Sequence, residues 1–229
     1  MRALVIAAVL AAPGVAHATD WSELAHTIQG GAWAHYEASD VHDGEAPTKF
    51  TDLTLVGFRL HGFVSRHRIG WHLGLDAAAG ATFGAPTGSM ARASGFAYDV
   101  ALLPVGLALR WGGSQMIGVG AGVGAMGAVG TLDDAATFPV EAFAELGLGS
   151  HLRVLARGRA SYLAGADGHA LDGMLAIRVG HAYEEYGMAS GNGYFAGVAY
   201  RELLGARYVG LVLGYSIDLG YPHRRRGVE

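Results

Sequence analysis

The chain has 229 residues, 51% of them hydrophobic and 37 of them glycine, with a formal net charge of −4 at pH 7. This length provides one domain, and so high an apolar fraction argues against low-complexity disorder. A nucleic-acid partner is not expected, because phosphate binding needs a clustered positive surface that this composition does not supply. The sequence has no cysteine, which excludes disulfides, thiolate metal sites and lipid attachment at an N-terminal cysteine.

The first 18 residues have the pattern of a secretory signal peptide. A positively charged residue, Arg2, precedes an apolar run over residues 3–12, and the sequence Ala-His-Ala ends at Ala18. Small residues at the positions of Ala16 and Ala18 are typical of a signal-peptide cleavage site. We therefore predict export, with cleavage after Ala18 and a mature protein that begins near Thr19.

Most of the remaining chain alternates apolar residues with small or polar ones at the spacing of two that a β-strand produces. In residues 69–84 the odd-numbered positions are all apolar, whereas the even-numbered positions are mainly glycine and polar residues. A soluble sheet would coat its second face with charged residues, whereas glycine with isolated charges suits the crowded polar lumen of a membrane barrel. The pattern predicts strands at residues 30–38, 52–63, 69–84, 96–111, 115–127, 138–147, 151–163, 173–183, 193–202 and 207–221.

The predicted fold is all-β, an antiparallel up-and-down transmembrane β-barrel over residues 19–221. Ten strands are an even number, as a bacterial barrel with both ends in the periplasm requires. Long and short connections alternate through the first eight strands, but the alternation fails at residues 184–192 and 203–206. Eight strands therefore stay open as the alternative. The predicted outer loops, which an extracellular partner would contact, are Asp40 to Thr51, Ala85 to Gly95 and Ala128 to Thr137.

The glycine-rich segment from Met116 to Met126 could be a membrane helix or a membrane strand. It lies in an uncharged run, residues 111–132, that is long enough to span a bilayer as a helix. Eight residues of that run are glycine, and each costs a helix interior about 1 kcal/mol relative to alanine. A dinucleotide-binding loop is disfavoured as well, because a turn-like sequence follows Gly127 where a helix would be needed. The period of two favours a strand.

As a strand, this segment supplies an inner wall without side chains. A turn at residues 112–114 would place Gly118 opposite Ala108, Gly120 opposite Gly106 and Gly122 opposite Pro104. We expect the bare wall to leave space for long arginine and glutamate side chains from later strands. Its residues are Gly106, Gly118, Gly120, Gly122 and Gly124.

Charged residues on the lumen side concentrate in the later strands. A three-residue turn at 148–150 would pair Glu145 with Arg153 and Glu141 with Arg157 in a charge ladder, and arginine outnumbers carboxylate in this region. Paired charges would plug the lumen, since buried charges are tolerated only when paired and small barrels are filled by side chains. Surplus arginines would instead give a pore an anion preference. The predicted ladder comprises Glu141, Glu145, Arg153, Arg157, Arg159, Arg178 and Arg201.

Two histidines form a second lumen feature. A four-residue turn at residues 65–68 would set His61 opposite His72, with Arg59 and Asp76 diagonal to them. Facing imidazoles can bind a metal or respond to pH. The spacing offers no third ligand, so we predict plain polar groups, with no metal and no cofactor.

Two residues conflict with the alternating pattern of residues 96–111. Asp99 falls on the lipid-facing side of this strand. Pro104 lies in mid-strand, where it removes a donor from the backbone ladder. Only a β-bulge would accommodate Pro104.

Taken together, these features resemble the small outer-membrane β-barrels of Gram-negative bacteria. The resemblance rests on the signal peptide, the alternating strands and the last strand, which ends on the aromatic Tyr221. It implies contact with outer-membrane lipid and with the barrel-assembly machinery, which reads such a terminal aromatic residue. The short basic tail at residues 222–229 departs from the usual pattern of the class.

The resemblance implies no activity by itself. Some small barrels are outer-leaflet enzymes that use a serine and a histidine on one outward wall, and no convincing pair of this kind is present in the sequence. We therefore predict a structural or interaction protein without enzymatic activity. A narrow anion-preferring channel and a lipid-modifying enzyme are the alternatives.

Overall fold

The computed structural model describes residues 27–43, 52–65, 68–84, 93–111, 115–128, 132–148, 151–165, 168–185, 188–203 and 206–221. The predicted signal peptide and the basic tail lie outside these residues. The described part consists of ten strands: β1 (Thr27–Asp43), β2 (Asp52–Ser65), β3 (Ile69–Gly84), β4 (Ala93–Trp111), β5 (Gln115–Ala128), β6 (Leu132–Leu148), β7 (Leu152–Ala164), β8 (Gly168–Glu185), β9 (Met188–Leu203) and β10 (Ala206–Tyr221). Among the residues described, no helix is long and apolar enough to cross a membrane.

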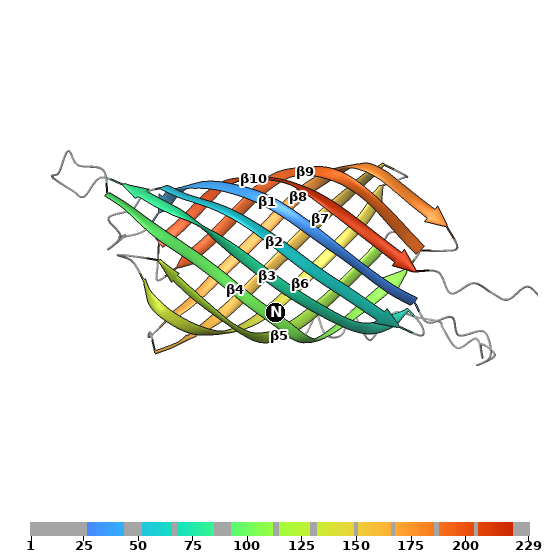
Figure 1. Cartoon of the computed structure of the whole chain (residues 1–229), viewed down its shortest axis with the longest axis horizontal. Coiled ribbons are helices and arrows are strands. Elements are labelled where there is room, and N and C mark those ends of the chain that lie inside the picture. The colour runs from blue at the N-terminus through green and yellow to red at the C-terminus, as the bar shows by residue number, and fades with distance from the viewer. Residues whose placement is uncertain are drawn as a thin grey trace, which may run out of the picture.

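The ten strands close into one barrel in which every strand is antiparallel to both of its neighbours. Consecutive strands pair around the ring, and β1 pairs with β10 from Ile28 opposite Tyr221 to Asp43 opposite Arg207. Figure 1 shows the strands running obliquely around the long axis of the barrel. Closure leaves no unpaired sheet edge. The prediction of ten strands is confirmed, and the eight-stranded alternative is wrong.

Several strands extend well beyond their predicted bounds. The ten strands contain 13 to 19 residues, whereas about 9 to 11 residues suffice to cross a bilayer. The predicted loop Ala128 to Thr137 is wrong, because β6 begins at Leu132, and β1 and β4 likewise take the ends of the other two predicted loops. At the outer end of the barrel the outer face is less apolar, as the outward and exposed Asp134 illustrates, so the alternating pattern fades there.

The two late connections that break the predicted alternation are both short. Strand β8 continues to Glu185 and β9 begins at Met188, so the connection within residues 184–192 is a tight one, as the periplasmic end requires. Strand β9 ends at Leu203 and β10 begins at Ala206. The outer connection at residues 203–206 is therefore short, and the ten-stranded topology tolerates it because antiparallel neighbours need only a tight turn.

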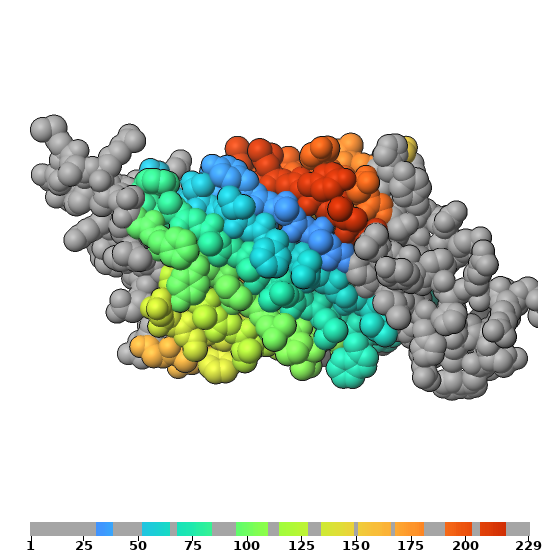
Figure 2. All heavy atoms as spheres, in the orientation of Figure 1, coloured from blue at the N-terminus to red at the C-terminus, as the bar shows by residue number. Residues whose placement is uncertain are grey.

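The barrel wall is apolar outside and polar inside. Outward positions carry exposed large apolar side chains such as Val56, Ile177 and Leu211, and Figure 2 shows the side chains of β1 to β4 and β10 covering one face without a gap. Inward positions carry charged residues together with three apolar clusters. This inversion of a soluble protein's faces is the arrangement of a membrane barrel.

A β-bulge in β4 corrects the placement of Asp99. Leu102 pairs with Val123 of β5, but Val105 pairs with Ala121, so β4 carries one extra residue at this point. The pairing of β4 with β3 shifts by one residue in the same region. The bulge contains Pro104, as a mid-strand proline requires. Since one extra residue reverses which positions face inward, Asp99 points into the lumen, where it is 6% exposed, and the prediction of a lipid-facing Asp99 is wrong.

Two hairpins have a register two residues away from the predicted one. Leu148 pairs with Leu152, which sets Glu141 opposite Arg159 and Glu145 opposite Leu155. Ser65 pairs with Gly70, which sets His61 opposite Gly74 and not opposite His72. Both turns lie at different residues than predicted. A slip of two keeps every side chain on its predicted face, so the faces are right and the partners are wrong.

Candidate functional site: the charged lumen

The charged residues that face the lumen come from nearly every strand. Among the side chains that the structure describes there are six arginines and seven carboxylates: Arg59, Arg153, Arg157, Arg159, Arg178, Arg201, Glu37, Asp76, Asp99, Glu141, Glu145, Asp172 and Asp218. Over the described lumen as a whole, arginine is therefore not in surplus. In β6 to β9, the region of the prediction, five arginines face three carboxylates, so the local surplus of arginine is present although Asp172, which the prediction places in a loop, reduces it.

One row of these residues alternates in charge across four neighbouring strands. Glu141 of β6 pairs with Arg159 of β7, Arg159 with Asp172 of β8, and Asp172 with Arg201 of β9. Arg159 Nε donates a hydrogen bond of 2.5 Å to Asp172 Oδ2. Opposite charges at facing positions of adjacent strands stabilise the sheet. This row, and not the predicted Glu145–Arg153 and Glu141–Arg157 pairs, is the true cross-strand ladder.

Glu141 lies at the centre of the lumen network and bonds both with the distant strand β2 and with the neighbouring strand β7. Arg59 of β2 donates to both of its carboxylate oxygens, at 2.5 and 2.6 Å. Arg157 of β7 donates a third bond through Nε, at 2.7 Å, so the predicted ion pair of Glu141 with Arg157 exists as a diagonal contact. Asp76 of β3 contacts both arginines, at 3.1 Å for Arg59 and 3.0 Å for Arg157. Forked bonds of this kind are the strongest that a guanidinium makes.

The network extends across the full width of the barrel. Arg201 of β9 donates to Asp99 of β4 at 3.0 Å, and these two strands lie on opposite sides of the ring of ten. Arg159 bonds with the same carboxylate. Arg201 also contacts Glu37 of β1, at 3.4 Å. Opposite walls of the barrel are thus joined through side chains.

A second group of charges surrounds Asp218 of β10. Arg178 bonds with this carboxylate, and Arg153 contacts it at 3.3 Å. Arg153 also lies 3.7 Å from Glu145, so the predicted pair of Glu145 and Arg153 is present as a contact although the two are not facing positions. The imidazole of His61 lies 3.9 Å from Asp218. This group therefore pairs two arginines with two carboxylates, although Arg153 Nε and Nη2 have no hydrogen-bond partner among the described residues.

The structure separates the two lumen histidines into different surroundings. His61 has its ring edge against Trp33, with centroids 5.8 Å apart. His72 lies against Phe143, with centroids 4.4 Å apart. Each is therefore packed on an aromatic ring of its own. In the described part of the chain, no three histidine and carboxylate side chains are grouped as a metal site would need.

The glycine wall forms with nearly the predicted register. Gly118 faces Ala108 and Gly120 faces Gly106, as predicted, whereas the bulge leaves Gly122 without the predicted pairing to Pro104. The side chains nearest to the wall differ from the expected arginine and glutamate. A Cβ atom on Gly118 would lie 2.5 Å from the ring of Phe143, and one on Gly124 would lie 2.7 Å from Thr137 Oγ1.

The space above Gly120 is more open. The nearest atoms to a Cβ atom there belong to Val105, Leu103 and His72, at 3.7 to 3.9 Å. Within the glycine wall, Gly118 is therefore the position at which the adjacent ring of Phe143 leaves no room for a side chain. Gly120 is flanked directly by Glu141 in the neighbouring strand.

Sequence reasoning also misses Glu37 and Asp172 as members of the network. Glu37 follows Trp33 and His35 at a spacing of two, which marks an inward position near the outer end of β1. Asp172 lies at an inward position of β8, four residues after the strand begins. Glu37 lies within the predicted strand at residues 30–38 and is detectable from the inward parity alone, whereas Asp172 becomes detectable once the predicted strand at residues 173–183 is extended at its start.

No protein-family model matches the chain, and no curated protein matches it. Among solved structures the chain is similar to the translocator domain of autotransporter NalP from Neisseria meningitidis, with 8% identity, coverage of 95% of this chain and 94% of that one, and a TM-score of 0.34. It is also similar to a deltaS2S3 mutant of the TodX monoaromatic hydrocarbon channel, with 8% identity, coverage of 86% and 91%, and a TM-score of 0.34.

The architecture follows from the chain's own geometry. The described strands close without an edge, expose apolar side chains outward and hold their charges inward. These are the requirements that a bilayer imposes on a spanning sheet. The chain is therefore an all-β, antiparallel, ten-stranded barrel with the architecture of the outer-membrane β-barrels.

Proposed function

We propose that this protein is an outer-membrane barrel of structural or interaction type whose lumen is closed by paired charges. The observation that carries the proposal is the set of bonds between distant strands, above all Arg201 to Asp99 at 3.0 Å and Arg59 to Glu141 at 2.5 Å. Each places a guanidinium across the path that an ion would take.

The burial of the paired charges also supports a closed lumen. Glu141 is 1% exposed and Arg59 is 2% exposed, although the lumen runs through their position. A permeating ion would have to separate these groups, and leaving one member of a buried pair unpaired costs about 3–5 kcal/mol. The anion-channel alternative relies on an arginine surplus, and the described lumen contains one carboxylate more than it has arginines.

A closed barrel would act through its surfaces. The apolar outer wall fits outer-membrane lipid, and export with insertion by the barrel-assembly machinery would bring the chain there. The ends of the barrel would then offer contacts to an extracellular partner. We propose no enzymatic role, and incubation of the reconstituted protein with lipid A or phospholipid, followed by mass spectrometry of the lipid, tests this part.

Planar-bilayer recording tests closure. The parent protein should give no steady conductance steps, whereas a double variant, Arg201→Ala with Asp99→Ala, should give measurable leak because it removes the bond across the lumen. Glu202→Gln is the matched control, since Glu202 is on an outward position and pairs with Tyr200 at 2.7 Å. Steady ion-selective steps from the parent protein would overturn the proposal.

A further inference from the structure

The first and last strands meet along a seam that no connecting segment ties together. Every other pair of neighbouring strands is consecutive in the chain and is joined by a connection of two to eight residues. Figure 1 shows β1 and β10 side by side, and their backbone pairing runs from Ile28 opposite Tyr221 to Asp43 opposite Arg207. This seam is therefore the place where two neighbouring strands can separate along their whole length without stretching a connection.

A first side-chain contact crosses the seam by passing over β10, from β9 to β1. The rings of Phe195 in β9 and Trp33 in β1 have centroids 5.8 Å apart, and both side chains are buried. Gly214 of β10 faces Phe195, and a Cβ atom on Gly214 would clash with the same ring. The glycine therefore leaves the space through which Phe195 reaches Trp33.

A second contact crosses the seam in the opposite direction, over β1, from β2 to β10. The Nε2 atom of His61 lies 3.9 Å from Oδ1 of Asp218. Gly31 of β1 faces both residues, and a Cβ atom on Gly31 would lie 2.5 Å from the ring of His61 and 2.8 Å from Oδ1 of Asp218. Here too, a glycine in a seam strand lies beneath the side chains that meet above it.

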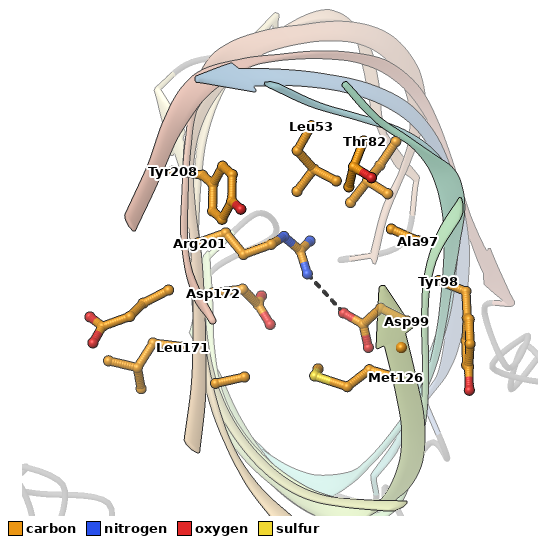
Figure 3. A pocket seen from close by; sticks show the side chains of 14 residues that line it. Leu53, Thr82, Ala97, Tyr98, Asp99, Met126, Leu171, Asp172, Arg201 and Tyr208 are labelled. Carbon is orange, nitrogen blue, oxygen red and sulfur yellow. Dashed lines mark hydrogen bonds and ion pairs between the residues drawn. The ribbon is translucent and has the colours of Figure 1, made fainter. Parts of the chain in front are cut away.

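A third contact joins β9 to β1 nearer the outer end of the barrel. Figure 3 shows Arg201 extending from β9 into the lumen toward Asp99. Its other terminal nitrogen, Nη2, lies 3.4 Å from Oε2 of Glu37, a residue of β1. Since Asp218 is near the end of β10 and Arg201 is near the end of β9, the three contacts are distributed along the seam.

We propose that these three contacts are seam straps, which hold β1 against β10 from inside the lumen, and that opening of this seam is the first step of barrel unfolding. Opening in a bilayer leaves the backbone groups of two strands without partners, which is costly in hydrocarbon. The straps break in the same step, because each joins strands on opposite sides of the seam. They therefore raise the barrier to unfolding and lengthen the lifetime of the folded barrel. This role does not depend on whether the lumen conducts ions.

Hydrogen exchange of backbone amides, measured on the barrel in lipid nanodiscs, tests where the barrel opens. Phe195→Leu shortens one strap and should raise exchange in β1 and β10 by at least about tenfold, with β4 to β7 unchanged, because exchange reports local opening. Phe143→Leu is the matched control. Phe143 is also buried in the lumen and also covers a glycine, Gly118, but it belongs to β6, so this variant should not raise exchange at the seam.

The strap formed by His61 gives a second and smaller perturbation. His61→Ala should raise exchange in β1 and β10, whereas His72→Ala should not. His72 is a suitable control because it is also buried in the lumen, but it belongs to β3 and packs on Phe143. Exchange at the seam that is the same in each variant and in its control would overturn the proposal.

A disulfide across the seam distinguishes a strap from ordinary packing. The chain has no cysteine, and Ala38 faces Leu211 across the seam on the outward side. Facing residues of antiparallel strands have the spacing that a disulfide needs. With Ala38→Cys and Leu211→Cys oxidised, unfolding in urea should be slower than in the reduced protein. Oxidation should also reduce the acceleration caused by Phe195→Leu and leave that caused by Phe143→Leu. An oxidised protein that unfolds as fast as the reduced one would show that the barrel does not open at this seam.

Discussion

Replacing Glu141 by alanine should destabilise the barrel by about 3–5 kcal/mol, because it removes one of the two carboxylates that the buried guanidinium groups of Arg59 and Arg157 share and leaves Asp76 as the only carboxylate common to both. The carboxylate accepts two bonds from Arg59 and one from Arg157, at 2.5 to 2.7 Å. Hydrogen bonds to charged groups contribute about 1.5–3 kcal/mol each. The summed value of the three bonds exceeds the expected loss, because bonds that share one carboxylate are not additive.

Urea titration of the barrel in lipid vesicles, with the folded fraction read from heat-modifiable gel mobility, measures this loss. A double-mutant cycle with Arg59→Ala should give a coupling energy of about 1–3 kcal/mol. Glu202→Gln removes an outward carboxylate that is paired with Arg207 at 3.6 Å, and it should cost less than about 1 kcal/mol. A loss below about 1 kcal/mol for Glu141→Ala, or a coupling energy near zero, would refute the account of a structural charge network.

Three further predictions concern other parts of the barrel. Gly118→Ala should destabilise the barrel by about 1–3 kcal/mol, because the new methyl group meets the ring of Phe143. In the same urea titration Gly120→Ala should be tolerated, and equal losses at both positions would contradict the packing described. Asp218→Asn should weaken the barrel by about 3–5 kcal/mol, because Arg153 and Arg178 both contact this carboxylate. Leu211→Arg, on the outward face, should cost about 2–4 kcal/mol in vesicles if it lies at the bilayer midplane, and no loss there would place this position outside the bilayer.

Side-chain faces are predictable from this sequence wherever a strand has no bulge, whereas strand partners are not. In a regular strand the face depends only on whether a residue number is odd or even, so a hairpin register that is wrong by two, as at Glu145 and His61, leaves the faces correct. The bulge in β4 breaks this rule, and the face of Asp99 is therefore predicted wrongly. The partner depends on where the turn lies, and residues such as Ser65 and Leu148 can belong equally well to a strand or to a turn. The lumen position of Arg153, Arg178 and Arg201 therefore follows from the sequence, but their partners do not.

The contacts across the lumen cannot be predicted from local sequence patterns either, but for a different reason. Arg201 and Asp99 are separated by about half the chain and lie on opposite walls. Their contact depends on how many strands close the ring and how far each is shifted along its neighbour. Neither quantity is encoded in a single hairpin, so the alternation that identifies the barrel does not reveal which charges join across it.

The bulge at Pro104 is the clearest case in which one extra residue determines which side chains of a strand face the lumen. Deleting Pro104 would restore unbroken alternation through β4 and reverse the half of the strand that precedes it. Asp99 would then face outward, and Val100 and Leu102, which are exposed on the outer face, would enter the lumen. Arg159 and Arg201 would lose their shared carboxylate.

The deletion should therefore abolish heat-modifiable folding in vesicles, whereas Pro104→Ala should retain it, because the extra residue itself, and not the proline ring, sets the parity. The decisive control inserts one glycine between Leu102 and Leu103 in the deletion variant. This chain has the original number of residues in β4 and should fold, since Asp99 returns to the lumen. A deletion variant that folds with parental stability would show that β4 keeps its inward residues by sliding along β3 and β5, and the bulge would then have no role in placing Asp99.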